Sequence, residues 1–277
     1  MTTLRDEKDA PWYSALRQRP HAFHAARYYP QFSYTLHTPE GYFEDPSGYE
    51  LIVVVHGSGR AAAEYRNAFA SFADAHRCVV LCPLFPVGIL GNGYADGYKN
   101  LVEGHIRYDL ALLSMVSDFE QASGRPFDKF RLFGFSGGGQ FAHRFLYVWP
   151  ERLDSVSIGS PGTMTRIDPD HDWWFGTRDV ASLFGKACDL EKLRCVQVQL
   201  VAGDQDLEEL WIPPWLEQAV KRLGPIGKNR VERLRQLRDN YEDKGIPVQL
   251  DLVPGVGHQG LKVVDAVQKF IAGKIRQ

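Results

Sequence analysis

Short unbroken apolar runs and helically spaced apolar stripes alternate along most of the chain. Runs such as 51–55 (LIVVV) and 78–82 (CVVLC) are typical of strands that are covered on both faces. Spacing such as that of Leu110, Leu113 and Val116 is typical of a helix with one buried face. The pattern predicts strands at 31–37, 51–55, 78–82, 130–133, 155–158, 196–201 and 248–253, and helices at 106–122, 140–149, 229–244 and 261–275.

Alternating strands and helices build a mostly parallel central sheet that is flanked by helices, so the predicted fold class is α/β. We expect residues 1–30 to form an N-terminal leader on or beside the core, and residues 31–277 to form a single domain. Two short cap-like insertions, at about 161–195 and 207–245, follow predicted strands at their carboxyl ends. Open α/β sheets bind ligands at this edge, so the insertions are candidates for pocket walls.

The composition is that of an ordinary folded protein. The chain has 277 residues, of which 44% are hydrophobic and 24% charged, which is enough to bury a sizeable core. Lys and Arg number 32 against 34 Asp and Glu, so the formal net charge is -2. Phosphate binding usually requires a basic excess, and we therefore expect no nucleic-acid partner. No stretch approaches the roughly 18 apolar residues of a membrane span, so no membrane partner is expected.

The cysteines and the first residues predict a reducing, cytoplasmic location. The opening residues are charged and lack the apolar core of a secretory signal. The four cysteines form no CxxC pair, and no histidine interleaves with them at zinc spacing, so no metal site is predicted. Cys78 and Cys82 are expected to be buried thiols on one face of a strand. A disulfide between Cys188 and Cys195 is not expected in that compartment.

The strongest local signal for chemistry is the segment GFSGG at 134–138, which lies between a predicted strand and a predicted helix. G-x-S-x-G in this context is a nucleophile elbow, a tight turn that exposes a serine hydroxyl above the sheet. Ser136 is therefore the candidate nucleophile. The pattern alone is weak, because a glycine-rich turn with a surface serine has the same residues.

A serine nucleophile needs an adjacent base that is held by a third group. The strand that starts at 196 runs into GDQD, which carries Asp204 and Asp206, and the last strand is followed by PGVGH, which ends at His258. Both segments follow strands, and their side chains can therefore reach the same sheet edge as Ser136. The chain order of serine, acid and histidine is the order expected of this fold. The spacing alone leaves both acids open.

Acyl transfer also needs backbone N–H groups that hold the developing oxyanion. One is expected from Gly137, directly after the candidate nucleophile. The other is expected from Ser58, in the segment HGSG that follows the strand over 51–55. His56 precedes the nucleophile in the chain, and we expect it to orient this loop by a hydrogen bond rather than to act as the base.

With these residues in place, the sequence resembles the α/β-hydrolase superfamily, and within it small bacterial serine esterases related to polyhydroxybutyrate-depolymerase-like and dienelactone-hydrolase-like proteins. The resemblance covers about residues 31 to 275 and rests on HGSG, GFSGG, GDQD and PGVGH. It implies that Ser136 is the nucleophile and His258 the general acid and base. It selects Asp206, three residues after the strand-end glycine, over Asp204. A solid polymer substrate is not expected, because neither a signal peptide nor a disulfide is predicted.

The resemblance implies hydrolysis of a small or medium carboxylic ester through an acyl-enzyme, with no metal and no cofactor. An acyltransferase that uses the same residues, and a ligand-binding protein on the same scaffold, remain alternatives. Tyr94 and Tyr98, in the segment between a strand and a helix at 85–104, are candidate substrate-binding residues together with Trp173 and Trp211 in the insertions. The competing interpretation is that these aromatic residues only pack the loops and the core.

Overall fold

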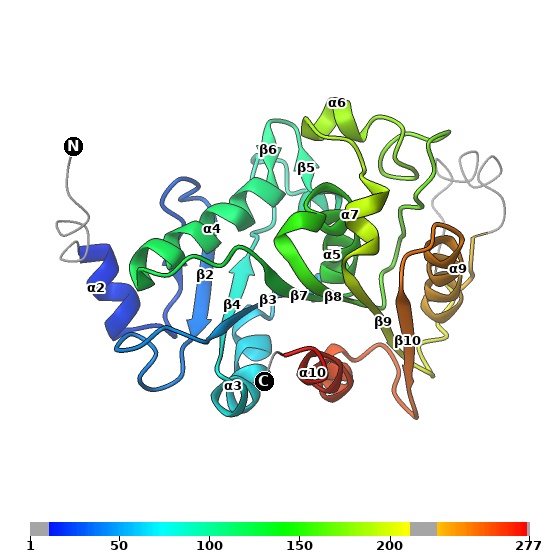
Figure 1. Cartoon of the computed structure of the whole chain (residues 1–277). Coiled ribbons are helices and arrows are strands. Elements are labelled where there is room, and N and C mark those ends of the chain that lie inside the picture. The colour runs from blue at the N-terminus through cyan, green and yellow to red at the C-terminus, as the bar shows by residue number, and fades with distance from the viewer. Residues whose placement is uncertain (1–10, 211–225, 276–277) are drawn as a thin grey trace.

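The computed structural model describes residues 11–210 and 226–275. These residues form an eight-stranded central sheet with helices on both faces (Figure 1). The strands run in the order β1-β2-β4-β3-β7-β8-β9-β10. Neighbouring strands are parallel from β4 to β10, whereas β1 and β2 are antiparallel to their neighbours, so the predicted mostly parallel sheet is confirmed. The strands are β1 (His24–Ala25), β2 (Ser33–His37), β3 (Glu50–Val55), β4 (Cys78–Leu84), β7 (Phe130–Phe135), β8 (Leu153–Gly159), β9 (Gln197–Gly203) and β10 (Val248–Val253).

Helices cover both faces of the sheet. On one face lie α4 (Tyr108–Ser123), α5 (Gly137–Val148) and α9 (Arg230–Asp243), and on the other α3 (Ala62–His76) and α10 (Val264–Ala272) (Figure 1). None of the helices in the described ranges is long and apolar enough to cross a bilayer. The shorter elements are α2 (Pro11–Gln18), η1 (Gly97–Asn100), β5 (Val102–Glu103), β6 (Ile106–Arg107), η2 (Pro150–Arg152), α6 (Val180–Phe184), α7 (Leu190–Arg194) and η3 (Gly260–Val263).

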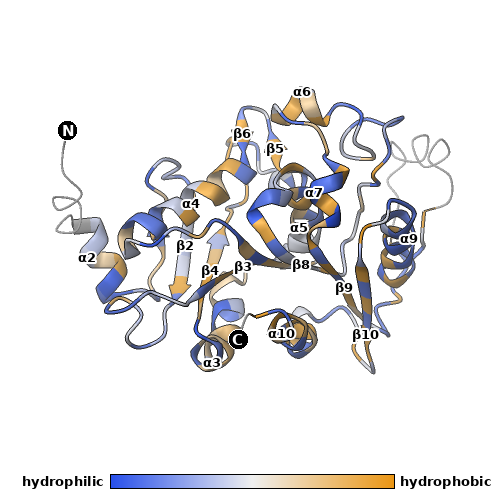
Figure 2. Ribbon diagram, in the orientation of Figure 1, coloured by the Kyte–Doolittle hydropathy of each residue, from blue (hydrophilic) through white to orange (hydrophobic). Residues whose placement is uncertain are grey.

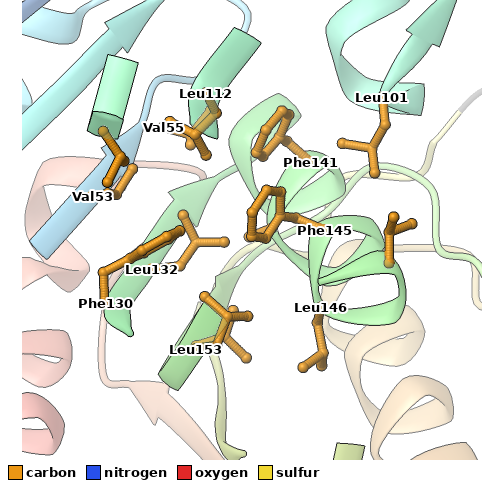
Figure 3. Close-up of a cluster of buried hydrophobic side chains, with 14 of the residues drawn as sticks. Val53, Val55, Leu101, Leu112, Phe130, Leu132, Phe141, Phe145, Leu146 and Leu153 are labelled. Carbon is orange, nitrogen blue, oxygen red and sulfur yellow. The ribbon is translucent and has the colours of Figure 1, made fainter. Parts of the chain in front are cut away.

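Alternation along the buried strands divides the core into two clusters. On β3, Val53 and Val55 face the α4 and α5 side, whereas Ile52 and Val54 face α3 and α10. Figure 3 shows the first cluster, in which the rings of α5 lie over side chains of β3, β7 and β8. Each such apolar side chain contributes about 1.5–3 kcal/mol when it is fully buried. The sheet is thus a rigid base for the loops at its edges.

Charged α9 is held to the sheet by a narrow apolar stripe. Figure 2 shows the helix as mainly hydrophilic, in agreement with its sequence. Its apolar positions are nevertheless buried, as the spacing predicts: Val231, Leu234, Leu237 and Tyr241. The helix ends where Gly245 adopts a positive φ of 70°, which a glycine accommodates without strain.

The described part of the leader, residues 11–30, packs on the domain. It contains α2 and β1, and it buries Leu16 and Ala26 in the larger core cluster. Cys78 and Cys82 are buried on one face of β4, as predicted, and all four cysteines are free thiols. In the two insertions lie α6 and α7, and then α9.

The N-terminus of α5 lies directly on the backbone of the sheet. A Cβ at Gly138 would come within 2.2 Å of the Val55 carbonyl oxygen, and a Cβ at Gly139 within 2.2 Å of the Gly159 oxygen. Only glycine permits so close an approach. Because these two positions lack side chains, α5 can begin directly against β3 and β8. This close packing also fixes the position of Ser136, the residue before the helix.

We predict that Gly138→Ala lowers the free energy of unfolding by about 2–4 kcal/mol, because the helix or the strand must move to accept the methyl group. Gly273→Ala is the matched control, since its Cβ would meet no atom nearer than 3.6 Å and its φ is -66°. The control is expected to change stability by no more than about 0.5 kcal/mol. Urea denaturation of both variants checks this, and equal stabilities would contradict it.

Candidate active site

Ser136 stands at a strained turn between β7 and α5. Its φ of 57° and ψ of -113° are unusual for a residue with a side chain. The turn is held by hydrogen bonds from the Ser136 amide to the Gly159 oxygen (2.8 Å) and from the Gln140 amide to the Ser136 oxygen (3.0 Å). The backbone therefore presents a partly exposed hydroxyl at the carboxyl end of β7, as a nucleophile elbow does.

Three side chains from distant parts of the chain meet at this hydroxyl. The Nε2 atom of His258 lies 3.0 Å from Ser136 Oγ, and its Nδ1 atom lies 2.7 Å from Asp206 Oδ2. An ionised carboxylate only accepts hydrogen bonds, so Nδ1 carries a proton and Nε2 is free to accept one. The Phe135 ring packs on the imidazole with 4.9 Å between ring centres. The arrangement is suited to removing the proton of the serine hydroxyl.

The Asp206 side chain is buried, with 1% of the residue's surface exposed, yet its carboxyl group stays ionised. Burial alone would raise the pKa of Asp206, but the hydrogen bond and the charge of His258 together with the charge of Arg230 outweigh it. The Ser160 hydroxyl acts in the same direction, and the pKa lies below its ordinary value. The carboxylate is therefore ionised at neutral pH.

Asp204 has a different partner. Its Oδ1 atom accepts a hydrogen bond of 2.8 Å from the Gly255 amide, and its own amide donates to the Val253 oxygen. These bonds join the segments that follow β9 and β10. Of the two acids that the spacing leaves open, the structure brings Asp206 and not Asp204 into contact with His258.

His56 is buried beside the site and fastens two loops together. Its Nε2 accepts a hydrogen bond of 3.0 Å from the Phe85 amide, so its Nδ1 is the donor to the Gly57 oxygen at 2.8 Å. These are loop-orienting hydrogen bonds of the predicted kind. Burial lowers the pKa of His56 to about 4, helped by the charge of Arg60 and opposed by the Gly57 carbonyl. The imidazole is therefore neutral at pH 7.

The loop after β3 lies against the start of α5. A Cβ at Gly57 would stand 3.6 Å from the Ser136 Cβ. The amide of Gly137 belongs to the first turn of α5, where N–H groups have no partner within the helix and the helix dipole is positive. Ser58 follows Gly57 directly and is exposed. Both segments that carry the predicted oxyanion donors therefore border Ser136.

The predicted substrate-binding residues occupy different environments. Tyr94 is 47% exposed, whereas Tyr98 is buried with its hydroxyl beside Gly137, where a Cβ would meet it at 2.1 Å. Trp173 is half-buried, and its Nε1 donates a hydrogen bond of 2.9 Å to the Asn100 oxygen in the same turn as Tyr98. Trp211 lies outside the described residues. Among the described members of this set, Tyr98 is the one whose hydroxyl lies beside Gly137, the residue after the candidate nucleophile.

Sequence reasoning missed one charged residue at the site. The Nη1 atom of Arg230 lies 3.1 Å from Asp206 Oδ1. A signal was present, because Arg230 lies in the first turn of the helix predicted over 229–244, where a positive charge is unfavourable next to the helix dipole. Its partner was not evident, since 24 positions separate the two residues.

The buried His56 predicts how stability depends on pH. Its folded pKa of about 4 lies below the ordinary value of 6.5, so its contribution is complete above pH 6.5 and is lost as the pH falls toward 4. We expect the loss of unfolding free energy between pH 7 and pH 5 to be about 2 kcal/mol smaller in His56→Gln than in the native protein. Urea denaturation at both pH values measures this. The exposed His105 is the control, and His105→Gln should lose as much as the native protein does.

The fold is shared with solved hydrolases, although the sequence matches no protein-family model and no curated protein. The poly(3-hydroxybutyrate) depolymerase LpqC from Bordetella parapertussis is 22% identical, with a TM-score of 0.73 and 97% of each chain covered. Poly(aspartic acid) hydrolase-1 from Sphingomonas sp. KT-1 is 20% identical, with a TM-score of 0.66 over 87% of this chain and 92% of that one. An S-formylglutathione hydrolase from Agrobacterium tumefaciens is 16% identical, with a TM-score of 0.59 over 92% and 94%. Likeness at these identities establishes the fold, and this chain has the α/β-hydrolase fold that its motifs predict.

Proposed function

We propose that this protein is a serine hydrolase that cleaves small or medium carboxylic esters through an acyl-enzyme. One observation carries the proposal: Ser136, His258 and Asp206 form a continuous hydrogen-bonded chain of 3.0 and 2.7 Å at a strained turn where Ser136 is partly exposed. A serine with this support is a nucleophile at neutral pH. The neighbouring structures bear the names of esterases and hydrolases, which supports ester hydrolysis in general.

In the proposed reaction, His258 takes the proton of Ser136 while Oγ attacks the ester carbonyl carbon. Asp206 orients the imidazole and stabilises its charged form. The imidazolium then protonates the departing alcohol, and an acyl-serine remains. Water, activated by the same histidine, attacks that ester and releases the acid. The protein, the ester and water supply every proton and electron pair in these steps.

The amides of Ser58 and Gly137 are the proposed donors to the tetrahedral oxyanion. Each such donor contributes about 3 kcal/mol to the stabilisation of the transition state. The donors are held before substrate arrives, because His56 fixes the first loop to the Phe85 amide and the start of α5 fixes the second. A site that is organised in advance spends little energy on reorganisation during the reaction.

We propose that aromatic side chains form part of the substrate pocket. Tyr94 is exposed on the segment after β4, and Trp173 lies half-buried near the turn that holds Tyr98. The last predicted member, Trp211, belongs to the second insertion. Such surroundings favour an ester with an apolar or aromatic acyl or alcohol group.

We predict that Ser136→Ala lowers kcat/KM for p-nitrophenyl esters by at least about a thousandfold, because the nucleophile is removed. Asp206→Asn is expected to lower it by about a hundredfold or more, since the amide cannot hold the same histidine tautomer. Asp204→Asn is the matched control and should stay within about fivefold of the native value, because the side chain still accepts from the Gly255 amide.

A fluorophosphonate provides the decisive measurement, because it labels an activated serine whatever the natural substrate is. Mass spectrometry should find one adduct, on Ser136, in the native protein and none in Ser136→Ala. If the native protein forms no adduct and leaves every ester of a graded chain-length series intact, the proposed function is wrong. If Asp204→Asn is inactive and Asp206→Asn is active, Asp204 and not Asp206 is the acid that supports His258.

A further inference from the structure

The carboxylate that faces His258 has a second partner, the cationic side chain of Arg230, which takes no part in the proposed reaction steps. Arg230 Nη1 lies 3.1 Å from Asp206 Oδ1 and 3.4 Å from Glu208 Oε2. His258 Nδ1 binds the other carboxylate oxygen, Oδ2, at 2.7 Å. Each oxygen of Asp206 is therefore bound by a separate group, and the plane of the carboxylate is fixed from two sides.

The start of α9 determines where Arg230 stands. Asn229 caps the helix by accepting a hydrogen bond of 2.9 Å from the Glu232 amide. In return, the Glu232 carboxylate accepts hydrogen bonds from Asn229 Nδ2 (3.1 Å) and from the Lys228 amide (2.8 Å). This reciprocal capping arrangement makes the first turn well ordered. A positive side chain in that turn opposes the helix dipole, so the demands of the helix do not explain Arg230.

Burial gives the contact its strength. The side chain of Asp206 is fully buried and that of Arg230 is 13% exposed, so water screens their charges weakly. In the described part of the chain, the Arg230 Nε atom is buried without a hydrogen-bond partner. The guanidinium donates its hydrogen bonds through Nη1 to the carboxylates of Asp206 and Glu208.

Building on the proposed function, we propose that Arg230 is a positioning residue that acts on His258 through Asp206. It holds the carboxylate in the plane that receives Nδ1–H. It also offsets part of the negative charge beside the imidazole, and in this way it sets the pH range in which His258 can accept the proton of Ser136. The second insertion would thus contribute to the proton-transfer machinery and not only to the shape of the pocket.

Other charged groups near the site have partners of their own. Arg233, on the next turn of α9, donates to the backbone oxygens of Gly227 and Gly162. Lys99 on η1 pairs with an aspartate three positions before it, and Asp204 is bound to a backbone amide. Tyr65 on α3 is buried, and burial raises its pKa. Glu208 is exposed, and it shares the Arg230 guanidinium with Asp206.

The test compares Arg230→Gln, Arg230→Lys and the control Arg238→Gln, which removes a charge on α9 that pairs with Asp239 and Glu242 instead. The measurement is kcat/KM for p-nitrophenyl acetate between pH 5 and 9. In Arg230→Gln the unopposed carboxylate favours the imidazolium, so the acid limb should move to higher pH by about 0.5–1 unit. We also expect kcat to fall about tenfold, because the carboxylate loses one of its two supports.

The other variants separate charge from packing. Arg230→Lys keeps the positive charge and should keep the acid limb within about 0.2 units of the native position, while Arg238→Gln should match the native profile throughout. If Arg230→Gln does not fold, Glu208→Gln takes its place, because the Glu208 side chain is 77% exposed. Glu208→Gln removes the negative charge that shares the Arg230 guanidinium with Asp206, so the acid limb should then move to lower pH.

An acid limb that does not move in Arg230→Gln, or that fails to move downward in Glu208→Gln where that variant replaces it, overturns this proposal. So does a limb that moves equally in Arg230→Gln and Arg238→Gln. These outcomes leave the proposed function intact, provided that the native protein forms the phosphonate adduct on Ser136. If that adduct is missing, the proposed function itself has failed.

Discussion

The close contact between the start of α5 and the backbone of the sheet is the constraint on which the rest of the site depends. Gly138 and Gly139 lie so near the carbonyl oxygens of β3 and β8 that no side chain fits between them. The chain must therefore turn sharply just before the helix, and Ser136 takes up that turn with a positive φ. Strain of this kind persists only where surrounding structure over-determines it. The Ser136 hydroxyl thereby stands at the carboxyl end of β7, directly before the first turn of α5.

Parallel strands then bring the remaining groups to the same point, because their carboxyl ends share one edge. The segments after β3, β7, β9 and β10 supply, in turn, the predicted oxyanion loop, Ser136, Asp206 and His258. Separate polar contacts hold these segments at fixed distances from one another. His56 binds the loops after β3 and β4, and Asp204 binds those after β9 and β10. Polar side chains that do not contact Ser136 or His258 thus hold the neighbouring loops together.

The sequence predicted the inner strands well because buried parallel strands are unbroken apolar runs, as in β3 and β4. The edge strand β10, in which polar and apolar residues alternate, also has the predicted bounds. It predicted α5 from residue 140, whereas the helix begins at Gly137, since three consecutive glycines carry no helical propensity and are ordered by packing alone. The two-residue strand β1 has no apolar pattern and forms because β2 offers an edge. Ser136, Asp206 and His258 were within reach of motif reasoning because each follows a strand. The Arg230 contact was not, because it joins a helix to a loop across the fold.

Burial of the candidate acid explains why the second insertion matters to the site. A carboxylate removed from water loses hydration worth several kcal/mol, and bonded partners must replace it. Asp206 finds one partner in His258 and another on α9. That helix is mostly charged, so it stays in place through its apolar stripe and through Tyr241, whose hydroxyl lies 3.0 Å from that of Tyr147 on α5. The helix that begins after the candidate nucleophile and the helix that carries Arg230 are therefore joined in the core by this hydrogen bond, so the supports on the two sides of His258 share one packed base.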